Sequence, residues 1–117
     1  MRIAIIVIAL AALVTFTVPA LAVTPIALSA SVGPGFTISL KRGSKVVTKL
    51  KKGSYRITVK DQSSNHNFHL KGPAVDKKST IQEVATKTWN VILKVGKYNF
   101  VCDPHRLTMK GMFTVTQ

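Results

Sequence analysis

The chain has 117 residues, and its 17 Lys and Arg against 4 Asp and Glu give a formal net charge of +13. This length suits one small domain with a single core, and the presence of one cysteine excludes an internal disulfide. Such a charge favours an acidic protein, an acidic cell-envelope polymer or anionic lipid headgroups as partner, while the lack of a recognisable binding motif argues against nucleic acid.

The N-terminal segment has the composition of a targeting sequence. A positive charge at Arg2 precedes an apolar run over residues 3–18, and the segment ends in Ala20-Leu21-Ala22. This order is typical of a secretory signal peptide. We therefore predict a signal peptide over residues 1–22 and an exported periplasmic, cell-envelope or extracellular domain over residues 23–117. The alternative is a retained membrane anchor, although the apolar run is short for a span.

Beyond the signal segment, short apolar runs alternate with turn residues. Alternation with period two is typical of half-buried strands, and clusters of Gly, Pro and Ser mark turns. Residues 74–82 are polar, and we expect them to be irregular, with a short helical turn as an alternative. Strands are predicted over residues 26–32, 36–40, 45–50, 55–61, 66–71, 83–94, 98–102 and 112–116.

These elements predict the fold class. Seven to eight short strands with no useful helical periodicity indicate an all-β protein, an antiparallel Greek-key β-sandwich. The strand pattern alone does not separate this fold from an immunoglobulin-like domain. The side chains that could bind a metal make that distinction.

One loop near the C-terminus, Cys102-Asp-Pro-His105-Arg-Leu-Thr-Met109-Lys-Gly, contains a thiol, an imidazole and a thioether. In an exported protein an unpaired cysteine is intermolecular, reactive or a ligand, and its neighbours here favour the ligand. Two His, one Cys and a long axial Met form the donor set of blue-copper electron-transfer sites. A catalytic Cys–His pair would need an orienting partner, and the acidic residues are too few to supply an obvious one.

The second histidine ligand is chosen by strand parity, because successive side chains point to opposite faces of a strand. His66 shares its parity with Phe68 and Leu70, so we expect it on the core side, where it can meet Cys102. A core histidine with a satisfied hydrogen bond is the alternative for His66. Asn67 and His69 have the opposite parity, which faces water, and His69 is predicted to be an ordinary exposed histidine.

Two methionines compete for the axial position. Met112 lies in the last predicted strand with parity opposite to Phe113 and Val115, so we expect it to point outward. Met109 lies in the loop and is the predicted ligand. Either methionine could otherwise be core filler.

The loop motif Cys-x-Pro-His-x-x-x-Met-x-Gly and the upstream His66-Asn67-Phe68 resemble the cupredoxins, the small blue copper proteins of the plastocyanin, pseudoazurin and azurin type. The resemblance covers residues 28–115 and implies a cupredoxin-like domain that binds one type 1 copper ion. The ligands that it implies are His66, Cys102, His105 and Met109. In one departure, three residues separate the loop His from the Met, where the plastocyanin pattern has four.

The resemblance also implies roles for residues around the ligands. Asn67 matches the family's Asn whose side chain ties the two ligand loops together. Pro104 has no N–H and cannot donate a second hydrogen bond to the Cys102 sulfur, where hydrogen bonding tunes the reduction potential. His105 is implied to lie nearest the surface and to be the electron port. We expect an apolar docking patch around it, formed by Pro34, Gly35, Pro104 and Leu107.

The leading hypothesis is therefore outer-sphere electron transfer between redox partners by a small exported monomer that is not an enzyme. The alternative is copper storage or delivery, for which Met-rich tracts are expected, and the chain has only three Met. A copper oxidase or nitrite reductase would need a second metal centre, which three histidines cannot build beside this site. Structural zinc fits the ligands loosely. Membrane contact is expected only if the N-terminal segment is retained.

Overall fold

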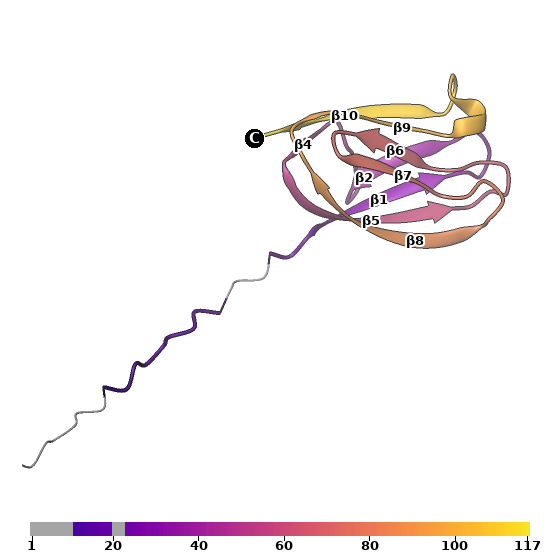
Figure 1. Ribbon diagram of the computed structural model, residues 1–117. Helices are drawn as coiled ribbons and strands as arrows, with labels where there is room; N and C mark the ends of the chain where they lie inside the picture. Colours follow the sequence, from indigo (N-terminus) through magenta and orange to yellow (C-terminus); the bar gives the residue numbers. More distant parts are fainter. Residues whose placement is uncertain (1–10, 20–22) are drawn as a thin grey trace, which may run out of the picture.

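The computed structural model describes residues 11–19 and 23–117 (Figure 1). Residues 1–10 and 20–22 of the predicted signal peptide lie outside the described residues, so the peptide and its cleavage stay a prediction. Within the described ranges, no helix has the length and apolar character needed to cross a membrane.

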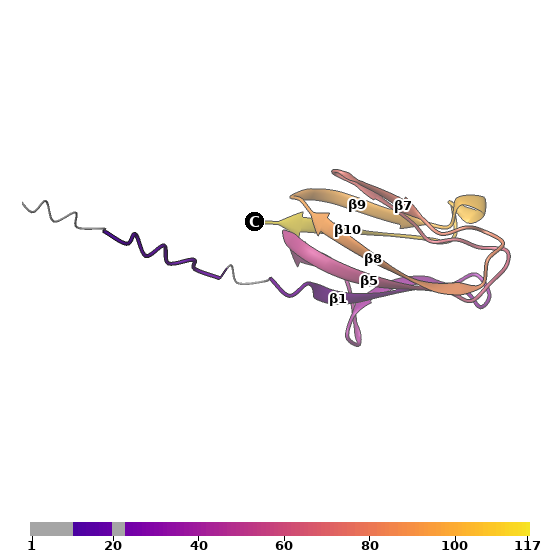
Figure 2. The ribbon, with the colours of Figure 1, turned by 60° about the horizontal axis from the view of Figure 1, so that its bottom comes forward.

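The domain consists of two five-stranded sheets, which lie in two layers with the core between them (Figure 2). The first sheet has the order β3-β2-β1-β5-β8, and the second has the order β4-β10-β9-β6-β7. The strands of the first sheet are β1 (Ile26–Val32), β2 (Ile38–Arg42), β3 (Lys45–Val46), β5 (Gly53–Asp61) and β8 (Ala85–Leu93). Those of the second are β4 (Lys49–Lys51), β6 (His69–Gly72), β7 (Val75–Lys78), β9 (Gly96–Val101) and β10 (Lys110–Thr116).

The predicted all-β sandwich is confirmed, but the described residues form ten strands rather than seven or eight. The predicted strand over 45–50 divides into β3 and β4, which belong to different sheets. The prediction that residues 74–82 are irregular is wrong, because β7 forms there and pairs with β6. β7 buries only Val75, which suits a charged strand at the edge of a sheet.

The sheets are mixed, although the sequence pattern indicated antiparallel pairing. β1 pairs in parallel with β5 from Ile26↔Tyr55 to Val32↔Asp61, and β4 pairs in parallel with β10. After β3 the chain leaves the first sheet, adds β4 to the second and returns as β5. The alternation of side chains along a strand is the same for either direction of pairing, so periodicity could not reveal this.

The core lies between the sheets and contains stacked aromatic pairs. The rings of Phe68 and Phe100 are 5.3 Å apart, and those of Tyr98 and Phe113 are 5.1 Å apart. Gly111 faces the Phe100 ring so closely that a Cβ at this position would overlap it. This close approach explains why a glycine ends the Met-x-Gly motif of the loop.

Three connections meet at one end of the sandwich. They follow β1, β5 and β9, and the last of them contains the short 3-10 helix η1 (Asp103–His105) (Figure 1). Their proximity brings residues from distant parts of the sequence to the edge of the core.

Candidate metal centre

The side chains of His66, Cys102 and His105 meet at this end of the core. The Cys102 Sγ atom lies 3.6 Å from the Nδ1 atom of each histidine, and the two Nδ1 atoms are 3.1 Å apart. Nitrogen and sulfur atoms with these separations can share one ion at ordinary metal–ligand distances of about 2.0–2.3 Å. The donor set, one thiol and two imidazoles, fits copper.

Cys102 and His105 are positioned by the end of β9 and by η1. Cys102 directly follows β9 and is buried, and its carbonyl accepts a hydrogen bond from the His105 N–H at 3.0 Å. This hydrogen bond closes a tight turn, which places the imidazole of His105 next to the Sγ atom of Cys102. A proline near the start of η1 fits the turn, because its missing N–H needs no partner there.

Met109 is brought to the site by the next turn of the loop. Its N–H donates to the carbonyl of His105 at 2.8 Å, and its own carbonyl accepts from the Cys102 N–H at 3.0 Å. Met109 and Cys102 are both fully buried. Met112 is 63% exposed, so the expectation that it points outward is confirmed.

His66 is buried, but not for the reason that parity suggested. β6 begins at His69, so His66 lies in the preceding loop and the alternation rule does not apply to it. The loop is shaped by the Asp61 carboxylate, which accepts from the Ser63 N–H at 3.1 Å. The loop is also anchored at Phe68, whose N–H donates to the Ser79 hydroxyl at 2.8 Å. Hydrogen bonds on both sides of His66, one of them to a distant segment, therefore fix the loop that carries it.

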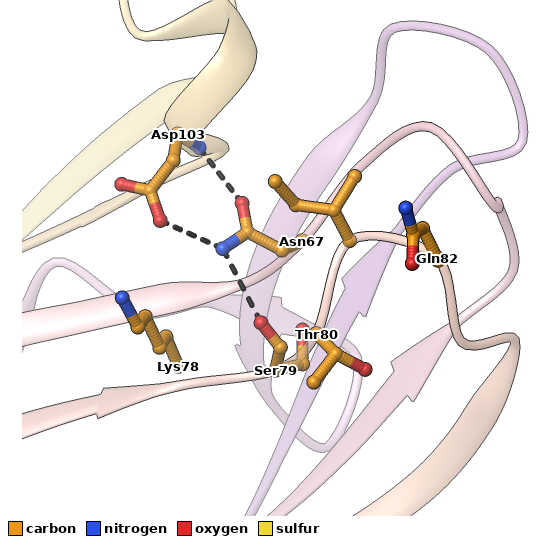
Figure 3. A pocket seen from close by; sticks show the side chains of 7 residues that line it. Asn67, Lys78, Ser79, Thr80, Gln82 and Asp103 are labelled. Carbon is orange, nitrogen blue, oxygen red and sulfur yellow. Dashed lines mark hydrogen bonds between the residues drawn. The ribbon is translucent and has the colours of Figure 1, made fainter.

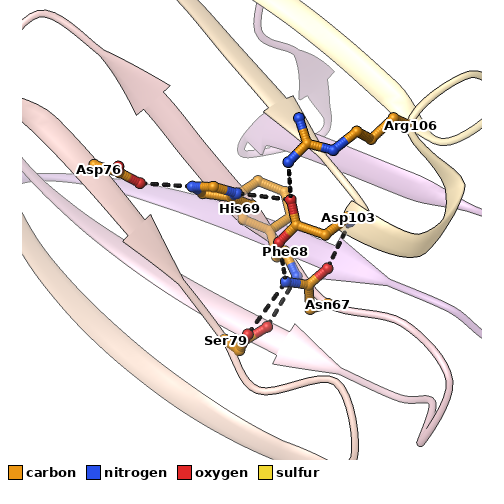
Figure 4. Close-up of polar contacts among 7 residues, drawn as sticks. All are labelled: Asn67, Phe68, His69, Asp76, Ser79, Asp103 and Arg106. Atoms are coloured by element: carbon orange, nitrogen blue, oxygen red, sulfur yellow. Dashed lines mark hydrogen bonds and ion pairs between the residues drawn. The ribbon is translucent and has the colours of Figure 1, made fainter.

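Asn67 joins the loop of His66 to the loop of Cys102. Its Nδ2 atom donates to the Asp103 carboxylate at 2.7 Å and to the Ser79 carbonyl at 3.3 Å (Figures 3 and 4). Its Oδ1 atom accepts from the Asp103 N–H at 2.8 Å. The expectation that residue 67 faces water, as parity implied, is wrong, because it too precedes β6 and is buried.

His69 differs most from its prediction as an exposed histidine. Its side chain is only 12% exposed and lies between two carboxylates, 2.6 Å from Asp76 and 2.8 Å from Asp103 (Figure 4). Asp76 belongs to β7, the strand that the sequence pattern did not indicate. The prediction for His69 is wrong because it did not include β7, which carries one of the two acids that cover the ring.

Phe36 is a further residue at the site that the sequence pattern placed elsewhere. β2 begins two residues later than predicted, so Phe36 is 69% exposed instead of sharing the face of Leu40. Its ring lies edge-on at 5.4 Å from the ring of His66 and 5.0 Å from that of His105. The preceding Gly33-Pro34-Gly35 turn is the signal that could have indicated a loop here.

The residues expected to form the docking patch are exposed. Pro34, Gly35 and Pro104 lie at the surface, and Leu107 is 87% exposed. His105 is half-buried, whereas the other three expected ligands are buried. Among the four expected ligands, His105 is therefore the most exposed residue.

Hydrogen bonds and burial shift the pKa values of the nearby acids. Burial raises the pKa of Asp103, but hydrogen bonds from His69 and Asn67 outweigh this, so the pKa lies below its ordinary value. The hydrogen bond with His69 also lowers the pKa of Asp76. For Asp61 burial dominates and raises the pKa, although the hydrogen bond from Ser63 opposes it.

A surface pocket of about 430 Å³ lies beside the Asn67–Asp103 contact (Figure 3). It is lined by Asn67, Lys78, Ser79, Thr80, Ile81, Gln82 and Asp103. None of the four expected ligands lines it, so it is separate from the metal centre.

Comparison with known families decides what this centre is. The family model of copper-binding proteins of the plastocyanin/azurin family matches residues 36–116. The chain belongs to this family. Copper is therefore its cofactor, as predicted, and members of this cupredoxin family generally carry electrons and act with redox partner proteins.

Solved cupredoxin structures share the fold. Reduced rusticyanin is 20% identical with a TM-score of 0.57, over 77% of this chain and 78% of its own. The solution structure of reduced rusticyanin is 20% identical with a TM-score of 0.55, over 79% and 77%. An oxidised mutant of amicyanin is 15% identical with a TM-score of 0.51, over 75% and 80%. Among curated proteins, no sequence matches the chain.

Proposed function

We propose that this protein binds one copper ion through His66, Cys102, His105 and Met109 and carries electrons between redox partners. The observation that carries the proposal is the convergence of one thiol and two imidazole nitrogens within 3.6 Å of one another. Bound copper would supply a one-electron couple between Cu(I) and Cu(II).

The chain contributes a rigid and dry set of ligands. Backbone hydrogen bonds tie Cys102 to His105 and to Met109, and Asn67 ties this loop to His66. Three of the four ligands are buried, which excludes water from the site. Side chains held in this way keep nearly the same positions in both oxidation states, so little nuclear rearrangement opposes electron transfer.

The surface around His105 supports brief docking. Pro34, Gly35 and Leu107, together with Phe36, place exposed apolar surface next to the half-buried imidazole. We propose that a partner packs against this patch and exchanges electrons through the His105 edge. Because the patch is small, the complex is expected to be weak and to dissociate quickly.

The charge and the N-terminal segment support the remaining parts of the proposal. A net charge of +13 attracts a partner with an acidic surface, and the rate of such an association falls as salt is added. We propose that the domain works as a monomer, and that it is exported, because residues 1–22 have the pattern of a signal peptide that directs export.

A visible absorption spectrum of the copper-loaded, oxidised protein tests the proposal. We expect an intense thiolate-to-copper band that is absent from the Cys102→Ser variant, and a reversible reduction potential with slow copper release. A copper-loaded protein without this band would refute the blue-copper assignment. Rapid copper exchange would instead identify a storage or delivery protein.

A further inference from the structure

His69, which lies beside the metal centre, is unusual because both of its ring nitrogens face carboxylates. Nδ1 lies 2.8 Å from Asp103 Oδ1, and Nε2 lies 2.6 Å from Asp76 Oδ1 (Figure 4). An ionised carboxylate only accepts hydrogen bonds, so a ring nitrogen that bonds to one must carry a hydrogen. Hydrogen bonds to charged groups are shorter and about twice as strong as neutral ones.

His69 stands where the backbone pairing between β6 and β9 ends. It is paired with Val101, the residue before Cys102, and no pair of these strands lies nearer to the metal centre. Beyond this pair the two segments continue as the loops that carry His66 and Cys102. The His69–Asp103 contact thus continues the connection through side chains, because Asp103 lies two residues beyond Val101, the last paired residue of β9.

Asp103 is the residue through which this contact reaches the ligand loops. One of its carboxylate oxygens accepts from His69, and the other accepts from Asn67 at 2.7 Å. Its backbone N–H donates to the Asn67 Oδ1 atom at 2.8 Å. The orientation of the carboxylate therefore decides whether the Asn67 Nδ2 atom can keep its bond across the loops, which supports the neighbouring bond from the Asp103 N–H.

We propose that His69 is a positioning residue for the copper site, which fixes the Asp103 carboxylate from β6 so that Asn67 holds the two ligand loops together. The effect on copper rests on the function proposed above. Arg106 also donates to Asp103 Oδ1, at 2.8 Å, but its side chain is 65% exposed. An exposed ion pair contributes little, so His69 is the partner that determines the orientation.

The first test uses the metal-free protein and compares His69→Ala with Arg106→Ala. Each substitution removes one donor to the same carboxylate oxygen, which makes the two variants a matched pair. We expect hydrogen exchange of the Asp103 backbone amide, followed by NMR, to become about tenfold faster in His69→Ala, as for the loss of one charge-assisted hydrogen bond. In Arg106→Ala it should change by less than about twofold. Equal exchange rates in the two variants would overturn the proposal.

The second test uses the copper-loaded protein. We expect His69→Ala to shift the electron paramagnetic resonance spectrum and the reduction potential, because the ligand loops are held less firmly. Arg106→Ala removes a positive charge and only an exposed donor from the same carboxylate, so it is the control for the effect of charge. Shifts of the same size in both variants would show that charge, and not positioning, is responsible.

A third measurement needs no substitution. In ¹H–¹⁵N NMR spectra of the unsubstituted metal-free chain, the Nδ1 atom of His69 should carry a hydrogen that exchanges slowly with water. An Nδ1 atom that carries no hydrogen would overturn the proposal, even if His69→Ala fails to fold. Because two of the three measurements use the metal-free chain, the absence of a blue copper band would refute the proposed function and leave the test of His69 intact.

Discussion

Replacing Asn67 with alanine should destabilise the domain before any metal is bound. The side chain is buried and makes hydrogen bonds at 2.7, 2.8 and 3.3 Å, two of them with Asp103 and the longest with the Ser79 carbonyl. Alanine removes all three and leaves the N–H and the carboxylate of Asp103 without these partners.

The size of the effect follows from the kind of each bond. The bond to the Asp103 carboxylate contributes about 1.5–3 kcal/mol because its acceptor is charged, and the bond from the Asp103 N–H contributes about 0.5–1.5 kcal/mol. The longest bond adds least. We therefore expect a loss of about 2–4 kcal/mol, which is a large part of the roughly 5–15 kcal/mol that stabilises a typical domain.

Urea unfolding of the metal-free protein measures this loss. Trp89 is the only tryptophan, and its ring lies 6.2 Å from that of Phe68, so its fluorescence reports on the packing of the core. With a denaturant slope of about 1–3 kcal/mol per molar, the midpoint should fall by about 0.7–4 M. Asn65→Ala is the matched control, because Asn65 is exposed in the same loop. If both variants unfold at the same urea concentration, the assignment of Asn67 as the tie between the loops is wrong.

Other consequences of the structure can be measured separately. Gly111→Ala should destabilise the domain by about 1–3 kcal/mol, because the new methyl group meets the Phe100 ring, and thermal unfolding will show whether it does. The pKa of Asp103 is lowered in the folded state, so its contribution to stability is present above the unfolded value and is lost as pH falls through the folded one. Asp103→Asn should accordingly flatten the acid side of the stability curve. The pKa of Asp61 is raised in the folded state, so its ionisation opposes folding. Asp61→Asn should therefore make the stability rise more steeply with pH on the acid side of the same curve. Phe36→Ala should slow electron transfer to a partner while leaving the unfolding temperature nearly unchanged, since the ring is mostly exposed.

Short-range features of the site were predictable from the sequence. Cys102, His105 and Met109 lie within one loop, and turns of three and four residues are enough to bring them together. The opposite exposures of Met112 and Phe113 follow from strand alternation, which holds because both residues lie inside β10. In these cases the interacting residues are neighbours in the chain.

Parity failed where no strand exists. The rule placed His66 on the core side correctly, but Asn67 on the wet side wrongly, because both lie in a loop shaped by hydrogen bonds to Asp61 and Ser79. It also made His69 exposed, since β7 and the Asp103 loop that cover it come from other parts of the chain. Each of these errors concerns a contact between distant segments.

The amino-acid sequence by itself determined the all-β class, the copper donor set and the loop that carries three of its four members, because periodicity and local spacing are written into the order of residues. Only the tertiary structure decided the parallel pairs, the place of His66 and the chain of contacts from Asp76 through His69 and Asp103 to Asn67. Those contacts join residues up to 36 positions apart, and their formation depends on which strands become neighbours when the two sheets pack.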